Sequence, residues 1–285
     1  MNDQATRLKE LVAKNGERNS KFITIASGKG GVGKTNFALN FSYVMANEFK
    51  KKILLIDADI GMANIQLLLN VDPNKNMKNL LHGEAIEDVL QHSHGFDVLL
   101  GFSGIDDMQD LEEVTIQSLI FDLGRISKGY DYVVIDTGAG VSDSVVSFLR
   151  ASHKAYFITT PEPTALMDAY ALMRSVYNLY GYKEFKVVVN MAKSKEEGQE
   201  TFDRLKMTVQ KFLDIDIQLL GILPYTNNLK NSVRSKEIVA LRYPKDSYTT
   251  NIRAICQDES HAEPVKSESF WQKLFEFIGS GSKRI

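Results

Sequence analysis

Residues 28–35 place the strongest constraint on how this chain can fold. They read Gly28, Lys29, Gly30, Gly31, Val32, Gly33, Lys34 and Thr35, and they directly follow the apolar run Phe22–Ala26. Small residues let a backbone wrap closely around a phosphate, while consecutive N–H groups and the start of the next helix supply partial positive charge. Lys34 and Thr35 can reach phosphate oxygens and Mg²⁺. The spacing therefore predicts a phosphate-binding loop between a buried strand and a helix, not a merely flexible glycine-rich turn.

A second lysine distinguishes this loop from an ordinary phosphate loop. Lys29 lies five positions before Lys34, so the motif holds two cations where an ordinary loop needs one. The second cation requires its own explanation.

Composition narrows the class of protein. The chain has 285 residues, 44% of them hydrophobic and 25% charged, which is typical of one large globular α/β domain. A formal net charge of −2 gives no global basic field, so we expect no nucleic acid partner. The net charge does not exclude a local basic patch. The single cysteine, Cys256, can form neither an intramolecular disulfide nor a Cys-rich metal site, which fits a reducing cytoplasm.

The sequence also argues against export and membrane spanning. No apolar stretch approaches the length of a membrane span, and the N-terminus carries Asp3, Arg7, Lys9 and Glu10 in place of a signal-peptide core. We expect a cytoplasmic protein.

Short apolar runs alternate with helical patterns and predict an α/β fold. The runs lack polar alternation, which is typical of strands buried on both faces of a parallel sheet. We expect a mostly parallel, twisted central sheet with helices on both faces. The predicted strands are Phe22–Ala26, Ile53–Ile56, Phe96–Leu100, Tyr132–Ile135, Ala155–Ile158, Phe185–Val189 and Ile217–Leu223, and the predicted helices include Thr35–Phe49, Val114–Ser127, Ala165–Tyr180 and Glu196–Leu213.

Acidic residues stand where two of these strands end. Asp57 and Asp59 follow one apolar run, and Asp136 opens the small-residue segment Asp136–Gly140 after another. Such an acid can alternatively cap a helix, and such a segment can be simply a tight turn. Three phosphate-site elements at three strand exits nevertheless favour a metal-linked phosphate site.

Together these segments resemble the MinD/ParA/NifH-type ATPases. Gly28–Thr35 matches their deviant phosphate loop with Lys29 as the signature lysine, while Asp57–Asn64 resembles their first switch and Asp136–Gly140 their second. The resemblance covers residues 21–256. It implies a P-loop fold and ATP hydrolysis coupled to nucleotide-dependent homodimerisation, with ATP and Mg²⁺ as cofactors.

The resemblance also implies roles for the site residues. Lys34 would hold the β- and γ-phosphates, Thr35 would bind Mg²⁺, and Asp136 would hold the metal through water. Asp59 would orient the attacking water, and Asp57 would support the metal side of the site.

Two further features follow from the resemblance at the dimer interface. Lys29 would cross to the nucleotide of a second protomer and stabilise negative charge there, much as an arginine finger does. The segment Thr160–Tyr170 would form a dimer-facing junction between strand and helix, and we assign it no chemical role.

Residues at two more strand exits are candidates for the base. Asn190 can donate and accept hydrogen bonds, which suits the adenine edge, although an asparagine here can alternatively cap a helix. Pro224 and Tyr225 follow the last predicted strand. In the resembling family these positions frame the base, so we expect ATP as the nucleotide.

The C-terminal segment predicts a membrane anchor. Gln257–Ser269 is polar and acid-rich, and Phe270–Ile278 concentrates large apolar residues. A tether followed by an amphipathic helix favours reversible membrane binding, as in MinD-type proteins, although the helix can alternatively pack on the body of the protein. The predicted membrane residues are Phe270, Trp271, Leu274, Phe275, Phe277 and Ile278.

The N-terminal segment selects a branch of the family. Asp3, Gln4, Ala5 and Leu8 match the Asp-Gln-Ala-x-x-Leu motif of the FlhG group (also called FleN or YlxH), the MinD-like ATPases that control flagellar number and placement. In that group the motif stimulates the FlhF GTPase, with its glutamine at the partner's nucleotide. A frayed helix without a partner is the alternative.

These features predict four segments and one main function. The segments are a partner-binding helix and linker (1–20), the ATPase domain (21–256), a polar linker (257–269), and an amphipathic helix with a basic tail (270–285). We expect a flagellar regulator on the cytoplasmic face of the cell membrane. Flagellar switch components or a flagellar transcription regulator are further candidate partners. The alternatives are a MinD-type division-site ATPase, a ParA-type partition ATPase and a non-enzymatic scaffold.

Overall fold

The computed structural model describes residues 20–59, 65–101, 122–262, 270, 273 and 274. Eight strands of this part form one sheet in the order β3-β4-β2-β5-β1-β6-β7-β8, and every neighbouring pair is parallel except β3 and β4. The strands are β1 (Lys21–Ser27), β2 (Ile53–Ala58), β3 (Gln91–Ser93), β4 (Phe96–Leu99), β5 (Tyr132–Ala139), β6 (Lys154–Thr159), β7 (Phe185–Ala192) and β8 (Gln218–Pro224).

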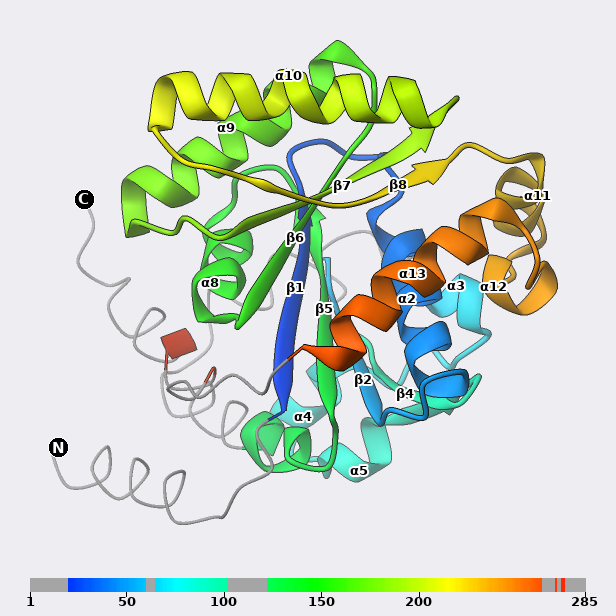
Figure 1. Ribbon diagram of the computed structural model, residues 1–285. Helices are drawn as coiled ribbons and strands as arrows, with labels where there is room; N and C mark the ends of the chain where they lie inside the picture. The colour runs from blue at the N-terminus through cyan, green and yellow to red at the C-terminus, as the bar shows by residue number, and fades with distance from the viewer. Residues whose placement is uncertain (1–19, 60–64, 102–121, 263–269, 271–272, 275–285) are drawn as a thin grey trace, which may run out of the picture.

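Helices cover both faces of this sheet (Figure 1). One face carries α2 and α13, and the other carries α8, α9 and α10. The structure therefore confirms the predicted fold class. The helices are α2 (Lys34–Asn47), α3 (Ile65–Leu69), α4 (Met77–Leu81), α5 (Ile86–Val89), α8 (Asp143–Ala151), α9 (Pro163–Tyr180), α10 (Lys195–Leu213), α11 (Asn227–Ser235), α12 (Val239–Arg242) and α13 (Ser247–His261).

The central strand β1 is buried on both faces, which explains its unbroken apolar sequence. Ile23 and Ile25 pack with Phe37 and Phe41 of α2 in one core cluster. Ala26 packs in the cluster on the opposite face. Because β1 lies between β5 and β6, the loop that follows it emerges at the middle of the sheet's carboxyl edge, where open α/β sheets bind ligands.

Two predictions about element limits need correction. The sequence pattern did not reveal β3, a three-residue antiparallel edge strand whose burial is only partial. Helix α13 continues through Cys256 to His261 and packs on α2 and β8, so residues 257–261 belong to the ATPase fold and not to a linker. The predicted helix Val114–Ser127 lies largely outside the described residues, although residues 122–127 are helical.

A buried ionic network fastens the end of α13 to the sheet. Glu259 is 3% exposed and accepts hydrogen bonds from Lys154 Nζ at 2.7 Å to each carboxylate oxygen and from the Tyr156 hydroxyl at 2.6 Å. Lys21 Nζ donates to the carbonyl of Ala262 at 2.6 Å. The segment that leads to the C-terminus therefore starts from a fixed point at the amino end of β1 and β6.

Two C-terminal residues dock beside this network. Phe270 is 1% exposed, and its ring stacks on Phe22 of β1 with centroids 4.2 Å apart and planes at 5°. Leu274 is also buried in the same core cluster. In this conformation neither side chain is available to a membrane, so the alternative of packing on the body is confirmed for these two residues. Trp271, Phe275, Phe277 and Ile278 lie outside the described residues.

None of the helices within the described residues is long and apolar enough to cross a bilayer.

His153 also contacts Phe22 and is held neutral. Its Nδ1 accepts a hydrogen bond from the Phe22 amide at 3.0 Å, and the two rings lie 5.7 Å apart. Burial, together with the positive charges of Lys273, Lys154 and Lys21, lowers the pKa of His153 to about 4.

This arrangement predicts a specific loss of stability in acid. The unfolded chain, with a histidine pKa near 6.5, binds the proton more readily than the folded chain, so the free energy of unfolding falls as the pH drops from about 6.5 to about 4. We expect His153 to account for about 2 kcal/mol of that fall. In His153→Asn the side-chain oxygen can still accept the Phe22 amide but does not titrate. Urea unfolding at pH 7 and pH 4.5 should show a smaller acid loss for the variant, and equal losses would contradict the assignment.

Candidate functional site

Two carboxylates stand side by side at the carboxyl edge of the sheet. Asp57 of β2 is the register partner of Asp136 of β5, and both side chains are buried. Lys34, the first residue of α2, donates from Nζ to Asp136 Oδ1 at 2.8 Å and is itself 7% exposed. The structure thus brings together the phosphate-loop lysine and the two acids that the sequence placed at separate strand exits.

Asp57 and Asp136 are two neighbouring buried acids, and Lys34 is bonded to one of them, Asp136. Burial, and next the charge of Asp136, raises the pKa of Asp57 to about 8. Asp136 Oδ2 is buried and has no hydrogen-bond partner among the described residues. A buried, unpartnered carboxylate oxygen beside a second acid is a donor set that suits a hard divalent cation bound through water. Asp136 and Asp57 therefore fit Mg²⁺, and Thr35 follows Lys34 as the second residue of α2.

Asp59 links the two segments that resemble switches. Its backbone N–H donates to Asp57 Oδ1 at 3.1 Å. Its carboxylate lies against Gly138, where an added Cβ would be 3.2 Å from Asp59 Oδ1. Burial raises the pKa of Asp59, while Lys34 acts against that shift. The predicted role of Asp59 in orienting a water molecule stays a prediction, and residues 60–64 of the first switch lie outside the described residues.

Two glycines make the phosphate loop fit between its neighbours. Gly33, the N-cap of α2, has a φ of 87°, a left-handed conformation that favours glycine. At Gly28 an added Cβ would lie 2.1 Å from the carbonyl oxygen of Asp168 in α9. The start of the loop is therefore packed directly on the backbone of α9.

Asn190 holds the loop from the side of β7. It lies in a bulge where the register between β7 and β8 shifts, next to Met191 with its φ of 58°. Its Nδ2 donates to the Val32 carbonyl at 2.8 Å, and its Oδ1 is buried without a partner among the described residues. One N–H of Nδ2 is therefore engaged by the loop, and the role of this amide toward adenine stays a prediction.

Pro224 and Tyr225 lie beside Asn190 at the end of β8. Pro224 pairs with Ala192 of β7, and the Tyr225 N–H donates to the Ala192 carbonyl at 2.9 Å. The Tyr225 side chain is 50% exposed. The structure therefore brings these predicted base-framing residues to the same edge as the phosphate loop.

The second lysine of the phosphate loop, Lys29, is bonded to residues outside the cluster of Lys34, Asp57 and Asp136. Lys29 Nζ donates to Glu162 Oε2 at 2.8 Å and to Thr164 Oγ1 at 2.9 Å. Glu162 and Thr164 lie in the segment to which the sequence assigned no chemical role. An acid three residues after the end of β6 was the only signal that could have identified them.

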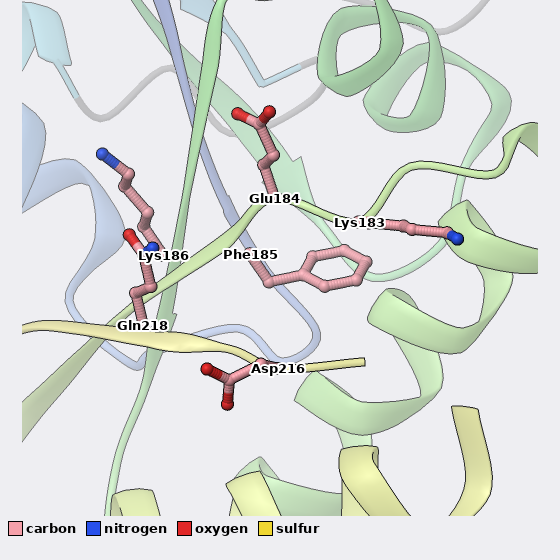
Figure 2. A pocket seen from close by; sticks show the side chains of 6 residues that line it. All are labelled: Lys183, Glu184, Phe185, Lys186, Asp216 and Gln218. Carbon is pink, nitrogen blue, oxygen red and sulfur yellow. The ribbon is translucent and has the colours of Figure 1, made fainter. Parts of the chain in front are cut away.

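A pocket of about 380 Å³ lies at the opposite edge of the sheet, where β7 and β8 begin. Figure 2 shows its lining residues, which carry both signs of charge. Asp216, one of them, is bonded to Lys206 Nζ at 2.8 Å. The pocket is remote from the strand exits, and we give it no part in the phosphate chemistry. Its lining residues are Lys183, Glu184, Phe185, Lys186, Asp216 and Gln218.

The N-terminal motif of Asp3, Gln4, Ala5 and Leu8 lies outside the described residues.

Comparison with known proteins identifies the family. A family model described as the CobQ/CobB/MinD/ParA nucleotide binding domain matches residues 23–239, which contain the phosphate loop, both buried acids and Asn190. The chain belongs to the CobQ/CobB/MinD/ParA family. The antiactivator FleN of Pseudomonas aeruginosa is 34% identical over 267 residues, which cover 91% of this chain and 95% of FleN. The flagellum site-determining protein YlxH of Helicobacter pylori is 32% identical over 98% of this chain and all of YlxH. These similarities confirm the resemblance to the FlhG group.

Solved structures of this family share the fold. The septum site-determining protein MinD from Pyrococcus horikoshii, complexed with Mg-ADP, is 22% identical and matches with a TM-score of 0.67 over 85% of this chain and 96% of its own. A chain of the MinC:MinD cell division complex from Aquifex aeolicus is 24% identical, with a TM-score of 0.66 over 88% of this chain and 100% of its own.

The contact between the loop and α9 makes a testable prediction. In Gly28→Ala the new methyl group would collide with backbone atoms of Asp168, so the loop must shift away from its binding geometry. We expect affinity for a fluorescent ATP analogue to fall by about tenfold or more, equivalent to about 1.4 kcal/mol.

Gly30→Ala is the matched control for this variant. A Cβ at Gly30 meets no protein atom within 4 Å, so this neighbour in the same loop should lose less affinity. Equal binding by both variants would show that packing on α9 does not position the loop.

Proposed function

We propose that this protein is a Mg²⁺-dependent ATPase that closes as a homodimer on ATP and uses the cycle to regulate flagellar number and placement. The observation that carries the proposal is that the two lysines of one loop have different surroundings. Lys34 is buried in the carboxylate cluster, whereas Lys29 is 38% exposed and directed away from it. A second exposed cation has a use if another protomer brings a nucleotide within its reach.

The carboxylate cluster supports the metal part of the proposal. Asp136, Asp57 and Thr35 would hold Mg²⁺, which when bound supplies positive charge that offsets the phosphate oxygens. Lys34 would hold the phosphates, and Asp59 would orient the attacking water.

The orientation of Asn190 supports ATP over GTP. Because one N–H of Nδ2 donates to the Val32 carbonyl, the amide is held in one orientation, and its Oδ1, which has no partner among the described residues, can accept a hydrogen bond. The 6-amino group of adenine donates to such an oxygen, whereas the 6-oxo group of guanine would face it acceptor to acceptor. Pro224 and Tyr225 would flank the base.

Docking of Phe270 and Leu274 suggests how membrane binding is controlled. Both are buried against the sheet here, so a helix formed by residues 270–278 would contact lipid only after leaving this position. Two released helices on one dimer would bind more tightly than one, without new contacts in either. We propose a cytoplasmic protein that associates peripherally with the membrane as a dimer.

The flagellar role is supported by the relatives. FleN is named an antiactivator and YlxH a flagellum site-determining protein. We extend that role to this chain and propose that Gln4, with Asp3, Ala5 and Leu8, stimulates a GTPase of the FlhF type. Division-site selection of the MinD type is the second candidate, since MinD proteins also match the chain. A ParA-type partition role would require DNA binding.

The dimer cycle predicts the behaviour of a slowed enzyme. Asp59→Ala should bind ATP but hydrolyse it slowly, so with saturating ATP and Mg²⁺ the variant should sediment as a dimer and bind anionic liposomes. The double variant Asp59→Ala, Lys29→Ala should dimerise much less. Analytical ultracentrifugation and liposome co-sedimentation measure both properties.

A truncated chain separates the two parts of this prediction. Removing residues 270–285 from Asp59→Ala should abolish liposome binding and leave dimerisation intact. A full-length Asp59→Ala protein that stays monomeric with saturating ATP would refute the dimer cycle.

The N-terminal motif gives a prediction that separates the flagellar role from the alternatives. A peptide of residues 1–20 should accelerate GTP hydrolysis by an FlhF-type protein, and the same peptide with Gln4→Ala should not. Phosphate release with and without each peptide is the measurement. Absence of acceleration by the native peptide would remove the reason to prefer a flagellar regulator over a MinD-type protein.

A further inference from the structure

The amine of Lys29 has binding partners within its own protomer. Its Nζ donates to the Glu162 carboxylate at 2.8 Å and to the Thr164 hydroxyl at 2.9 Å, both at the start of α9. The lysine and glutamate side chains are 38% and 67% exposed, so the pair is accessible to solvent and to a second protomer. The cation needed across the interface is thus already engaged.

The start of α9 would repel an ammonium group without Glu162. Glu162 is the N-cap of α9, yet its side chain makes no capping hydrogen bond and is bonded to Lys29 instead. Pro163, the first helical residue, has no N–H to donate. Helix N-termini carry partial positive charge and disfavour cations. The carboxylate of Glu162 is therefore what makes this place favourable for Lys29, and Thr164 adds a neutral acceptor.

Lys29 extends from a loop that is packed on α9. Gly28, the residue before it, lies against the backbone of α9, where an added Cβ would be 2.1 Å from the Asp168 carbonyl oxygen. Rotation of the Lys29 side chain would release it from Glu162 and Thr164 and leave this backbone contact in place.

We propose that Glu162 is a positioning residue that retains Lys29 on its own protomer and so raises the protein concentration at which ATP-bound protomers pair. This inference rests on the proposed function, in which Lys29 acts across the dimer. Because an exposed ion pair is weak, Glu162 should shift the equilibrium toward bound Lys29 without preventing its release. Removing the Glu162 carboxylate should raise the population of released Lys29 in each protomer by about two- to fivefold. Because a dimer needs two released lysines, the concentration for half-dimerisation should fall by about four- to twenty-five-fold.

The chain contains a closely matched control pair. Lys206 and Asp216 are also 2.8 Å apart, with side chains 42% and 68% exposed, at the opposite edge of the sheet. Asp216 lines the pocket of Figure 2 and is remote from the phosphate loop. Asp216→Asn therefore removes an ion pair of the same length and exposure without touching Lys29.

The first experiment measures release of Lys29 in the full-length protein without nucleotide. Limiting acetylation of lysine amines, read by peptide mass spectrometry, should label Lys29 about two- to fivefold faster in Glu162→Gln than in the wild type. In Asp216→Asn the rate at Lys206 should rise and the rate at Lys29 should not. An unchanged rate at Lys29 in Glu162→Gln, with Lys206 responding in its own variant, would overturn the retention.

The second experiment measures pairing in the Asp59→Ala background with saturating ATP and Mg²⁺. Adding Glu162→Gln should lower the concentration for half-dimerisation, whereas adding Asp216→Asn should leave it unchanged. Thermal unfolding midpoints of the variants check that each is folded. A monomeric Asp59→Ala parent would refute the proposed dimer cycle itself. If the Asp59→Ala parent is dimeric but Glu162→Gln leaves its concentration for half-dimerisation unchanged or raises it, only the retention of Lys29 would be overturned.

Discussion

Two buried carboxylates on adjacent strands need a cation, and this requirement organises the functional edge of the molecule. Asp57 and Asp136 are register partners, and Lys34 forms an ion pair with Asp136. Burial, and next the charge of Asp136, raises the pKa of Asp57, and Asp136 Oδ2 has no hydrogen-bond partner within the described part of the chain. A site of this kind is a poor stabiliser of the fold, and a bound Mg²⁺ would supply the missing positive charge.

The two edges of the sheet serve different purposes. At the carboxyl edge, Asp136 Oδ2 and Asn190 Oδ1 are buried and have no hydrogen-bond partner among the residues that the structure describes. At the amino edge, the carboxylate of Glu259 is paired with Lys154 and Tyr156, and Phe270 stacks on Phe22 close by. Saturated contacts favour a fixed structure, whereas unsaturated ones favour a ligand. β1 joins the two edges, because Phe22 lies at its start and the phosphate loop follows its end.

Much of the functional edge could be predicted from local sequence. Gly28–Thr35 specifies a strand, a loop and a helix, and parallel strands oblige Asp57 and Asp136 to emerge near that loop. Contacts between distant segments could not be predicted in this way. Lys29 and Glu162 are 133 residues apart, and Lys154 and Glu259 are 105 apart. Nothing in the sequence around either member identifies its partner, since the pairing depends on how helices α9 and α13 lie on the sheet.

The sequence by itself determined the fold class, the phosphate loop and the acids that face it, because these follow from strand burial and residue spacing. Only the tertiary structure decided how three side chains are used. The packing of β7 commits one N–H of Asn190 to Val32, the start of α9 retains Lys29 on its own protomer, and the face of β1 buries Phe270. Each outcome depends on which surface lies within about 3 to 4 Å of a side chain, the range of hydrogen bonds and packing contacts, and the arrangement of layers sets that distance.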